Sequence, residues 1–235
     1  TGSSWVIHNN PRGRYFDQMP DSKSTPNKDY LLRDVVRAST AAPTYFEPEK
    51  IKVADDVEGA FVDGGVSPHN NPALQLLMLA TLKGHALRWP MGADQLLLVS
   101  LGTGSKTFRL DPKDVMDMKA AMLGVRGLAS LMDDASALNQ LLLQWMSSSE
   151  TAHEIDSEIG DLKGDILGGG KPLLTYLRYD VKFDDPWLKD KLNAEQLKTI
   201  AEMDRAENMD QLVEIGKAAA GRIKDEHFGR GFDIE

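Results

Sequence analysis

The sequence contains no cysteine among its 235 residues. Disulfide bonds and thiolate chemistry are therefore excluded, and the absence fits a protein of the reducing cytoplasm. No apolar run reaches the roughly 18 residues that a membrane-spanning helix requires, and the opening residues do not predict a signal peptide. We expect a globular protein that resides in the cytoplasm and contacts membranes only peripherally.

Positive charge is also scarce. The chain has 27 Lys and Arg residues against 36 Asp and Glu residues, which gives a formal net charge of −9. Nucleic-acid phosphates and anionic lipids attract basic surfaces, so this balance argues against a nucleic-acid partner and against purely electrostatic membrane binding. Any contact with a membrane must therefore be apolar. The five histidines lack the spacing of metal ligands, and we expect no metal and no other cofactor.

The chain does contain an alternation of strand-like apolar runs and longer helical patterns, and 41% of its residues are hydrophobic. The run at 95–102 is continuous enough for a strand that is buried on both faces. Such alternation favours an α/β fold with a mainly parallel sheet, in which sites lie at the carboxyl ends of strands. The predicted strands are 5–9, 59–64, 95–102 and 173–181, and the predicted helices are 28–39, 71–84, one or two within 114–146, and two after Trp187.

An acidic residue follows one of these strands. In the sequence FVDGG (61–65), two apolar residues precede Asp63, and Gly64 and Gly65 follow it. A strand end holds a carboxylate rigidly, while the glycines can adopt positive φ and let another group approach it. This pattern favours an acid that contacts a ligand or a catalytic group. The alternative is an ordinary turn, because Asp-Gly is a common turn sequence.

The segment 114–146 is apolar over a broad helical face and is rich in methionine. We expect it to cover the sheet, with methionine side chains filling irregular gaps in the core. The alternative is an adaptable wall for an acyl chain or a surface in contact with lipid.

Three segments follow one another along the chain: RASTAAPTYFEP (37–48), FVDGGVSPHNNPALQLL (61–77) and LLLVSLGTGS (96–105). In this order and at this spacing, they resemble the second half of a patatin-like phospholipase domain. Bacterial members of that family also have segments similar to 5–17 and 204–220 of this chain. The resemblance implies a three-layer α/β/α sandwich in a single domain, with a core at 1–182 and helical cladding at 183–235.

The same resemblance implies a function. Members of the family hydrolyse acyl esters in phospholipids, lysophospholipids and neutral lipids with a Ser–Asp dyad. By this match Asp63 is the acid of the dyad, and Gly64 and Gly65 give it room. Gly102 and Gly104 are then expected to shape a loop near the active site.

The serine partner of Asp63 is not found. The family places it in a G-x-S-x-G turn between a strand and a helix, and no serine of this chain has glycines at both positions. Ser67 comes nearest, but Pro68 lacks the N–H that the residue after such a serine donates to the oxyanion. His69 is expected to form or cap a turn rather than to act in catalysis. The glycine-rich stretch 167–172 follows the acid, whereas the family's oxyanion loop precedes the elbow.

We therefore expect the chain to be the carboxyl-terminal part of the domain, incomplete at its N-terminus, with the nucleophile in a missing N-terminal part. A second interpretation is a non-catalytic module that binds a nucleotide or a protein partner, with SLGTGS (100–105) as a nucleotide-binding turn. This signal is weaker, because Thr107 stands where G-x-G-x-x-G has its third glycine.

Overall fold

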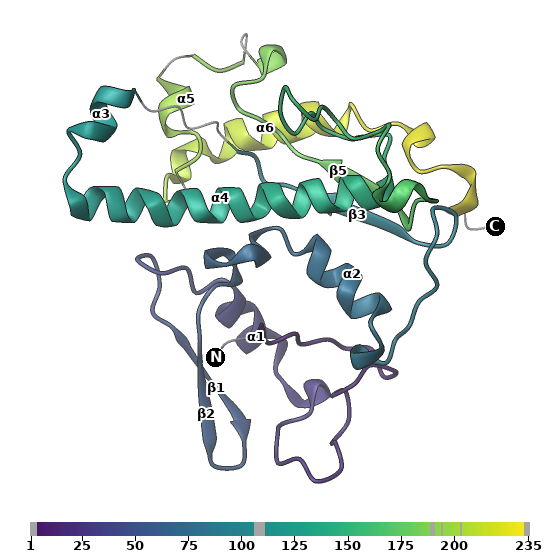
Figure 1. The fold of residues 1–235 in the computed structure, drawn as a ribbon. Coiled ribbons are helices and arrows are strands. Elements are labelled where there is room, and N and C mark those ends of the chain that lie inside the picture. Colours follow the sequence, from purple (N-terminus) through teal and green to yellow (C-terminus); the bar gives the residue numbers. More distant parts are fainter. Residues whose placement is uncertain (1–3, 106–110, 189–190, 194, 203, 233–235) are drawn as a thin grey trace. The chain divides into compact units, whose positions relative to one another are not determined.

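The computed structural model describes residues 4–105, 111–188, 191–193, 195–202 and 204–232. The chain divides into two compact units, both drawn in Figure 1. Unit 1 comprises Thr1–Met91 and Leu128–Leu142, and unit 2 comprises Gly92–Gly127 and Leu143–Glu235. Within the described ranges, no helix is both long and apolar enough to cross a membrane.

Unit 1 contains a β-hairpin. Its strands, β1 (Glu49–Ala54) and β2 (Val57–Phe61), pair antiparallel. The link between them is too short for the crossover that a parallel pair needs, so the sequence folds back directly. Along β1, Ile51 and Val53 are buried and the adjacent lysines are exposed, the period of two that places alternate side chains on opposite faces of a strand.

Two short helices belong to the same unit, α1 (Leu32–Ser39) and α2 (Ala73–Thr81). The side-chain oxygen of Asn71 accepts a hydrogen bond from the N–H of Ala73 at 3.3 Å, which satisfies one of the free donors at the start of α2. Apolar side chains of α2 then contribute to the core of the unit. The buried ones are Ala73, Leu77, Leu79 and Ala80.

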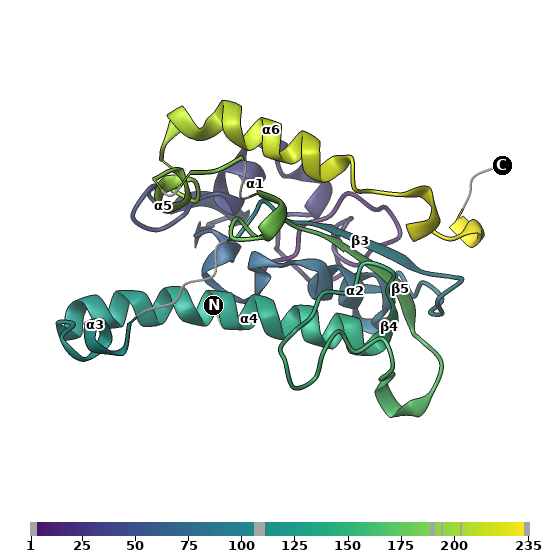
Figure 2. The same ribbon diagram turned by 90° about the horizontal axis from the view of Figure 1, so that it is seen from above.

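Unit 2 contains a three-stranded parallel sheet in the order β3-β5-β4, which Figure 2 shows from above. Its strands are β3 (Leu97–Leu101), β4 (Ser147–Ser148) and β5 (Leu174–Tyr179). The central strand β5 carries fully buried side chains, Leu174, Tyr176 and Leu177.

The longest helix, α4 (Ala120–Met146), contributes residues 128–142 to unit 1 and its remaining residues to unit 2. Unit 2 also contains α3 (Pro112–Met116), α5 (Gln196–Thr199) and α6 (Met209–Ala220). A hydrophobic cluster unites the segment after β5 with α6. Its buried members are Phe183, Leu188, Leu192, Ile200 and Ile215.

The predicted α/β class with a parallel sheet is confirmed, and the strands predicted at 95–102 and 173–181 form within it. The three-layer arrangement and the division into a core (1–182) and cladding (183–235) stay predictions. The methionine-rich segment is helical as predicted, but several of its apolar side chains are exposed. These include Met116, Met122, Leu123, Leu131 and Leu138.

Three local predictions are wrong. Residues 5–9 form no strand; side-chain contacts hold them instead, since Trp5 packs edge-on against Phe61 and His8 contacts the carbonyl of Arg14. The strand before Asp63 lies in an antiparallel hairpin rather than in the parallel sheet. β3 is not buried on both faces, because Leu98 and Ser100 are buried while the alternate residues Val99 and Leu101 are 40% and 72% exposed.

Candidate functional site

Asp63 lies two residues beyond the end of β2, at the start of a short 3-10 turn over Gly64–Val66. Its backbone N–H donates to the carbonyl of Ala41 at 3.0 Å, and Ala41 is fully buried. This bond joins two of the three segments on which the family resemblance rests, 37–48 and 61–77. The acid is therefore anchored at its backbone by a residue of the earlier segment.

The side chain of Asp63 is half-buried and oriented by a glycine. Its Oδ1 accepts a hydrogen bond from the backbone N–H of Gly65 at 2.6 Å. A Cβ at Gly65 would lie 2.9 Å from that same Oδ1 and 3.3 Å from the side-chain oxygen of Asn70. Glycine at position 65 thus gives the carboxylate the room to cap the turn, and the predicted room for a catalytic partner stays a prediction.

Positive φ, however, is not what these glycines supply. Neither Gly64 nor Gly65 is among the residues with positive φ, since both lie in the 3-10 turn. At Gly64 an added Cβ would make only an ordinary contact with His69, at 3.6 Å. Position 65 therefore needs a glycine because a larger side chain would collide with the carboxylate of Asp63, and not because its backbone is left-handed.

Ser67 and His69 form a local network around this turn. The hydroxyl of Ser67 donates to the carbonyl of Gly64 at 2.6 Å and lies 2.8 Å from Nδ1 of His69. The other ring nitrogen of His69 lies 3.2 Å from Oε1 of Gln75. Ser67 also accepts the N–H of His69 at 3.3 Å. His69 thus takes part in a capped turn, and the single proton of the Ser67 hydroxyl is directed at the carbonyl of Gly64.

One contributor to this region was not predicted. Asn139 of α4 is buried, and its amide donates to the backbone carbonyls of Pro68 and Asn71. The spacing of the motifs cannot reveal a partner about seventy positions away. The only available signal is an amide within the apolar run ALNQLLL (137–143), since a polar residue on an apolar helix face requires a buried partner.

The predicted loop residues Gly102 and Gly104 lie in unit 2, so their expected position near Asp63 stays a prediction. The side chain of Asp180 fills the space beside Gly102, and its Oδ1 accepts the N–H of Gly104 at 3.1 Å. Gly104 has a φ of +96°, and the ring of Phe183 occupies the place where a Cβ would stand. The two glycines are therefore required by close packing of the loop against the end of β5.

The carboxylate of Asp180 belongs to an ion pair. Its Oδ2 lies 2.6 Å from Arg178, which also donates to the hydroxyl of Ser100 at 2.8 Å. A carboxylate already seated against the amide of Gly104 would repel the phosphate that a nucleotide-binding turn must accept. The geometry therefore does not favour SLGTGS (100–105) as a nucleotide site. Sequence patterns did not indicate Arg178 or Asp180, because the contacts of this pair with Ser100 and Gly104 join segments that lie more than seventy positions apart in the chain.

Beside this ion pair, His153 is half-buried, and its Nε2 has no hydrogen-bond partner in the described part of the chain. Burial lowers the pKa of His153, and the nearby Lys182 lowers it further, whereas a hydrogen bond with the backbone of Arg178 and the charge of Asp180 raise it. The net shift is downward. The neutral imidazole is thus the form that the folded protein accommodates.

A pH dependence follows from the lowered pKa of His153. The unfolded chain, with a histidine pKa of about 6.5, binds a proton more readily than the folded one. The stability that neutral His153 contributes is therefore fully present above that pH and is lost as the pH falls below it. We expect the free energy of unfolding, measured by denaturant titration, to fall less on acidification in His153→Gln than in the wild type. If the two proteins differ in their free energy of unfolding by the same amount at pH 7.5 and at pH 5.5, the lowered pKa of His153 is contradicted.

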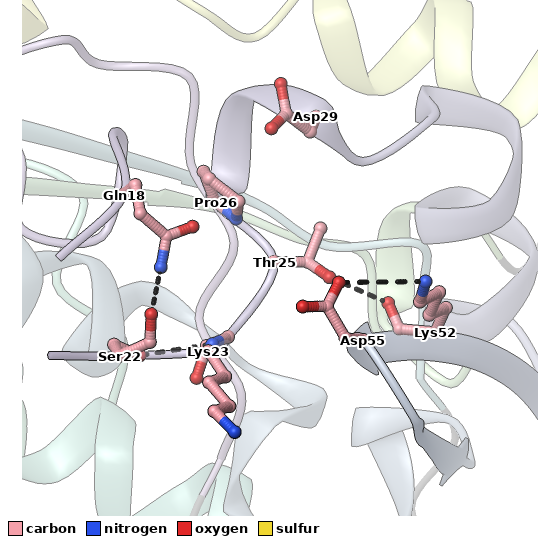
Figure 3. A pocket seen from close by; sticks show the side chains of 9 residues that line it. Gln18, Ser22, Lys23, Thr25, Pro26, Asp29, Lys52 and Asp55 are labelled. Carbon is pink, nitrogen blue, oxygen red and sulfur yellow. Dashed lines mark hydrogen bonds and ion pairs between the residues drawn. The ribbon is translucent and has the colours of Figure 1, made fainter.

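A polar pocket of about 450 Å³ opens in unit 1, between the segment 18–29 and the end of β1, as Figure 3 shows. Its charged lining residues carry both signs; Lys52 lies 4.0 Å from Asp55, and Thr25 donates to the carbonyl of Lys52 at 3.3 Å. Asp63 does not line it. The pocket therefore does not supply the environment of the predicted acid. In the described ranges, no cluster of three or more His, Cys, Asp or Glu residues has a metal-binding arrangement.

Comparison with known proteins identifies relatives of this chain. The family model of patatin-like phospholipase matches residues 3–77. Patatin-like protein 1 of Oryza sativa subsp. indica is 34% identical over 97 residues, which cover 36% of this chain and 23% of that protein. Patatin-07 and Patatin-13 of Solanum tuberosum are each 34% identical over 92 residues, covering 35% of this chain and 24% of those proteins. The chain thus spans about a quarter of the length of these curated relatives.

The family match contains the segments 37–48 and 61–77, which the bond between Ala41 and Asp63 joins. It ends before the third segment, 96–105, whose assignment stays a prediction. The predicted resemblance is therefore confirmed where the comparison reaches: residues 3–77 match the family model of patatin-like phospholipase.

Proposed function

We propose that this chain is part of a lipid acyl hydrolase in which Asp63 is the acid of a Ser–Asp dyad. The observation that carries the proposal is the anchoring of Asp63, inside the family match, by both its backbone and one carboxylate oxygen. Within the described residues, the other oxygen, Oδ2, has no hydrogen-bond partner. That oxygen is available to accept a proton from a serine hydroxyl.

The chemistry needs few groups. Asp63 takes the proton of the serine as the serine oxygen attacks the acyl carbonyl, and the C–O bond to the alcohol breaks. The departing alcohol takes the proton from Asp63. A water molecule then repeats the sequence on the acyl-serine, giving the fatty acid and the free enzyme. No metal or organic cofactor enters these steps.

The nucleophile of this proposal lies outside the 235 residues. Ser67 is a poor substitute, because its hydroxyl already donates to the carbonyl of Gly64 and Pro68 offers no N–H to an oxyanion. The turn that holds it serves to shape the segment after Asp63. Catalysis by the dyad thus requires sequence in addition to this chain.

The proposed substrates are phospholipids or lysophospholipids at a membrane surface, reached from the cytoplasm. Exposed apolar side chains flank the acid, with Val62 48% and Val66 45% exposed. Because the net charge is −9, attraction to anionic headgroups does not drive the contact, and apolar side chains must supply it. The same charge disfavours a nucleic-acid partner.

A hydrolysis assay tests the proposal. We expect the 235-residue chain alone to cleave neither p-nitrophenyl esters nor phospholipids, and the same chain with its native flanking sequence to cleave both. The reason is that the acid and the nucleophile must meet in one site. Ester hydrolysis by the isolated chain would overturn the placement of the nucleophile and make Ser67 the first residue to substitute.

A further inference from the structure

The segment that follows Asp63 is fixed by a residue far along the chain. The side-chain amide of Asn139, on α4, donates to the carbonyl oxygen of Pro68 at 2.6 Å and to that of Asn71 at 3.1 Å. Asn139 is only 7% exposed. Both bonds lie within unit 1. The amide thus spans the 3-10 turn over Pro68–Asn70 and binds the carbonyls at its two ends.

A continuous series of short bonds connects this turn with the acid. The N–H of Gly65 is held by Asp63 Oδ1, the N–H of Ser67 by the carbonyl of Gly64 at 3.1 Å, and the N–H of Asn70 by the carbonyl of Ser67 at 3.2 Å. The hydroxyl of Ser67 adds a second bond to Gly64. These bonds link the turn to the carboxylate in one connected network.

The segment that carries the acid is therefore attached to the rest of unit 1 at both ends. The bond from the N–H of Asp63 to the carbonyl of Ala41 holds one end. At the other end, Asn139 binds two backbone carbonyls, and the side chain of Asn70 donates to the hydroxyl of Ser136 at 3.5 Å. Without Asn139, the two carbonyls lose these donors. The second attachment is then weaker, and the carboxylate would sample a wider range of positions.

We propose that Asn139 is a positioning residue, which fixes the carboxylate of Asp63 through the segment 63–71; this inference rests on the proposed function. Proton transfer from a serine requires the carboxylate oxygen within hydrogen-bond reach, and small displacements of a catalytic group reduce turnover steeply. Asn139 contacts neither the substrate nor the reacting atoms. Its effect on the reaction passes through Asp63.

The chain offers a matched control on the same helix. Gln144 is also a buried amide, and it donates to two backbone carbonyls, those of His153 at 2.8 Å and Asp161 at 3.1 Å. It belongs to unit 2, whereas Asp63 and Asn139 belong to unit 1. The oxygen of Gln144 also accepts the N–H of His153 at 3.1 Å. Substituting either amide therefore removes donors to two backbone carbonyls, and a loss of stability alone would affect Gln144→Ala as well as Asn139→Ala.

The experiment compares Asn139→Ala with Gln144→Ala in the protein that carries its native flanking sequence. We expect Asn139→Ala to lower kcat for a p-nitrophenyl ester by about 10- to 100-fold with little change in KM, and Gln144→Ala to leave kcat unchanged. In the Asp63→Asn background, Asn139→Ala should cause no further loss. If Asn139→Ala does not fold, Asn139→Ser, which keeps one donor, is measured by the same criteria.

Hydrogen exchange provides a readout that does not depend on activity. We expect the amide of Gly65 to exchange faster in Asn139→Ala than in the wild type and equally fast in Gln144→Ala and the wild type. Unchanged exchange or unchanged kcat in Asn139→Ala overturns the inference. A double variant whose loss of kcat equals the product of the losses in Asn139→Ala and Asp63→Asn also overturns it. Full turnover in Asp63→Asn by itself would instead refute the proposed function, so the two failures are distinguishable.

Discussion

Asp63→Asn is expected to lower kcat for ester hydrolysis by about 10²- to 10⁴-fold, the usual contribution of a general base. The substitution preserves size, and its remaining oxygen can still accept the N–H of Gly65, as Oδ1 of Asp63 does at 2.6 Å. The other oxygen is replaced by an NH₂ group, which donates protons instead of accepting them. Substrate binding should survive, so KM should change little.

His69→Ala serves as the control for this result. Its ring contacts Ser67 and Gln75 in the turn after the acid, so its loss disturbs the surroundings of Asp63 without removing the base. We expect a much smaller decrease in kcat than for Asp63→Asn. If His69→Ala abolished turnover while Asp63→Asn preserved it, His69 rather than Asp63 would be the base.

Leu177→Ala is expected to destabilise the protein by about 2–5 kcal/mol, the range observed when a buried leucine is truncated. Leu177 lies on the central strand of the parallel sheet and is fully buried. The matched control is Leu101→Ala on the neighbouring strand β3, where the side chain is 72% exposed. Denaturant-induced unfolding should show a change below about 0.5 kcal/mol for this control. Equal changes for the two variants would contradict the burial of Leu177 and the exposure of Leu101.

The sequence predicted elements whose signal is local. The apolar runs that became β3 and β5 are long enough to be recognised from the chain alone, and α2 begins just after Asn71 and Pro72, the residues that mark its start. Pairing is not local. The run at 59–64 correctly predicts a strand before Asp63, but the antiparallel partner depends on the short link after β1, which an overall α/β alternation does not reveal.

The same distinction applies to the candidate site. Asp63 and the need for a small residue at Gly65 follow from five consecutive residues, whereas the carbonyl of Ala41 and the amide of Asn139 reach the site through the fold. Gly102 and Gly104 show that a local sequence pattern can also suggest a role that the packing of the fold does not support. A glycine-rich loop suggests a ligand, but the space beside these residues is filled by Asp180 and Phe183 of the same chain.

The central claim is that Asp63 accepts the proton of a serine nucleophile. It is tested most directly by reacting the protein, with its native flanking sequence, with a fluorophosphonate and determining the structure of the adduct. A fluorophosphonate bonds to an activated serine with loss of fluoride, so the adduct identifies the nucleophile. We predict a labelled serine in a G-x-S-x-G turn outside residues 1–235, with its Oγ within about 3 Å of the Asp63 carboxylate. Labelling of Ser67, or of a serine remote from Asp63, would contradict the account.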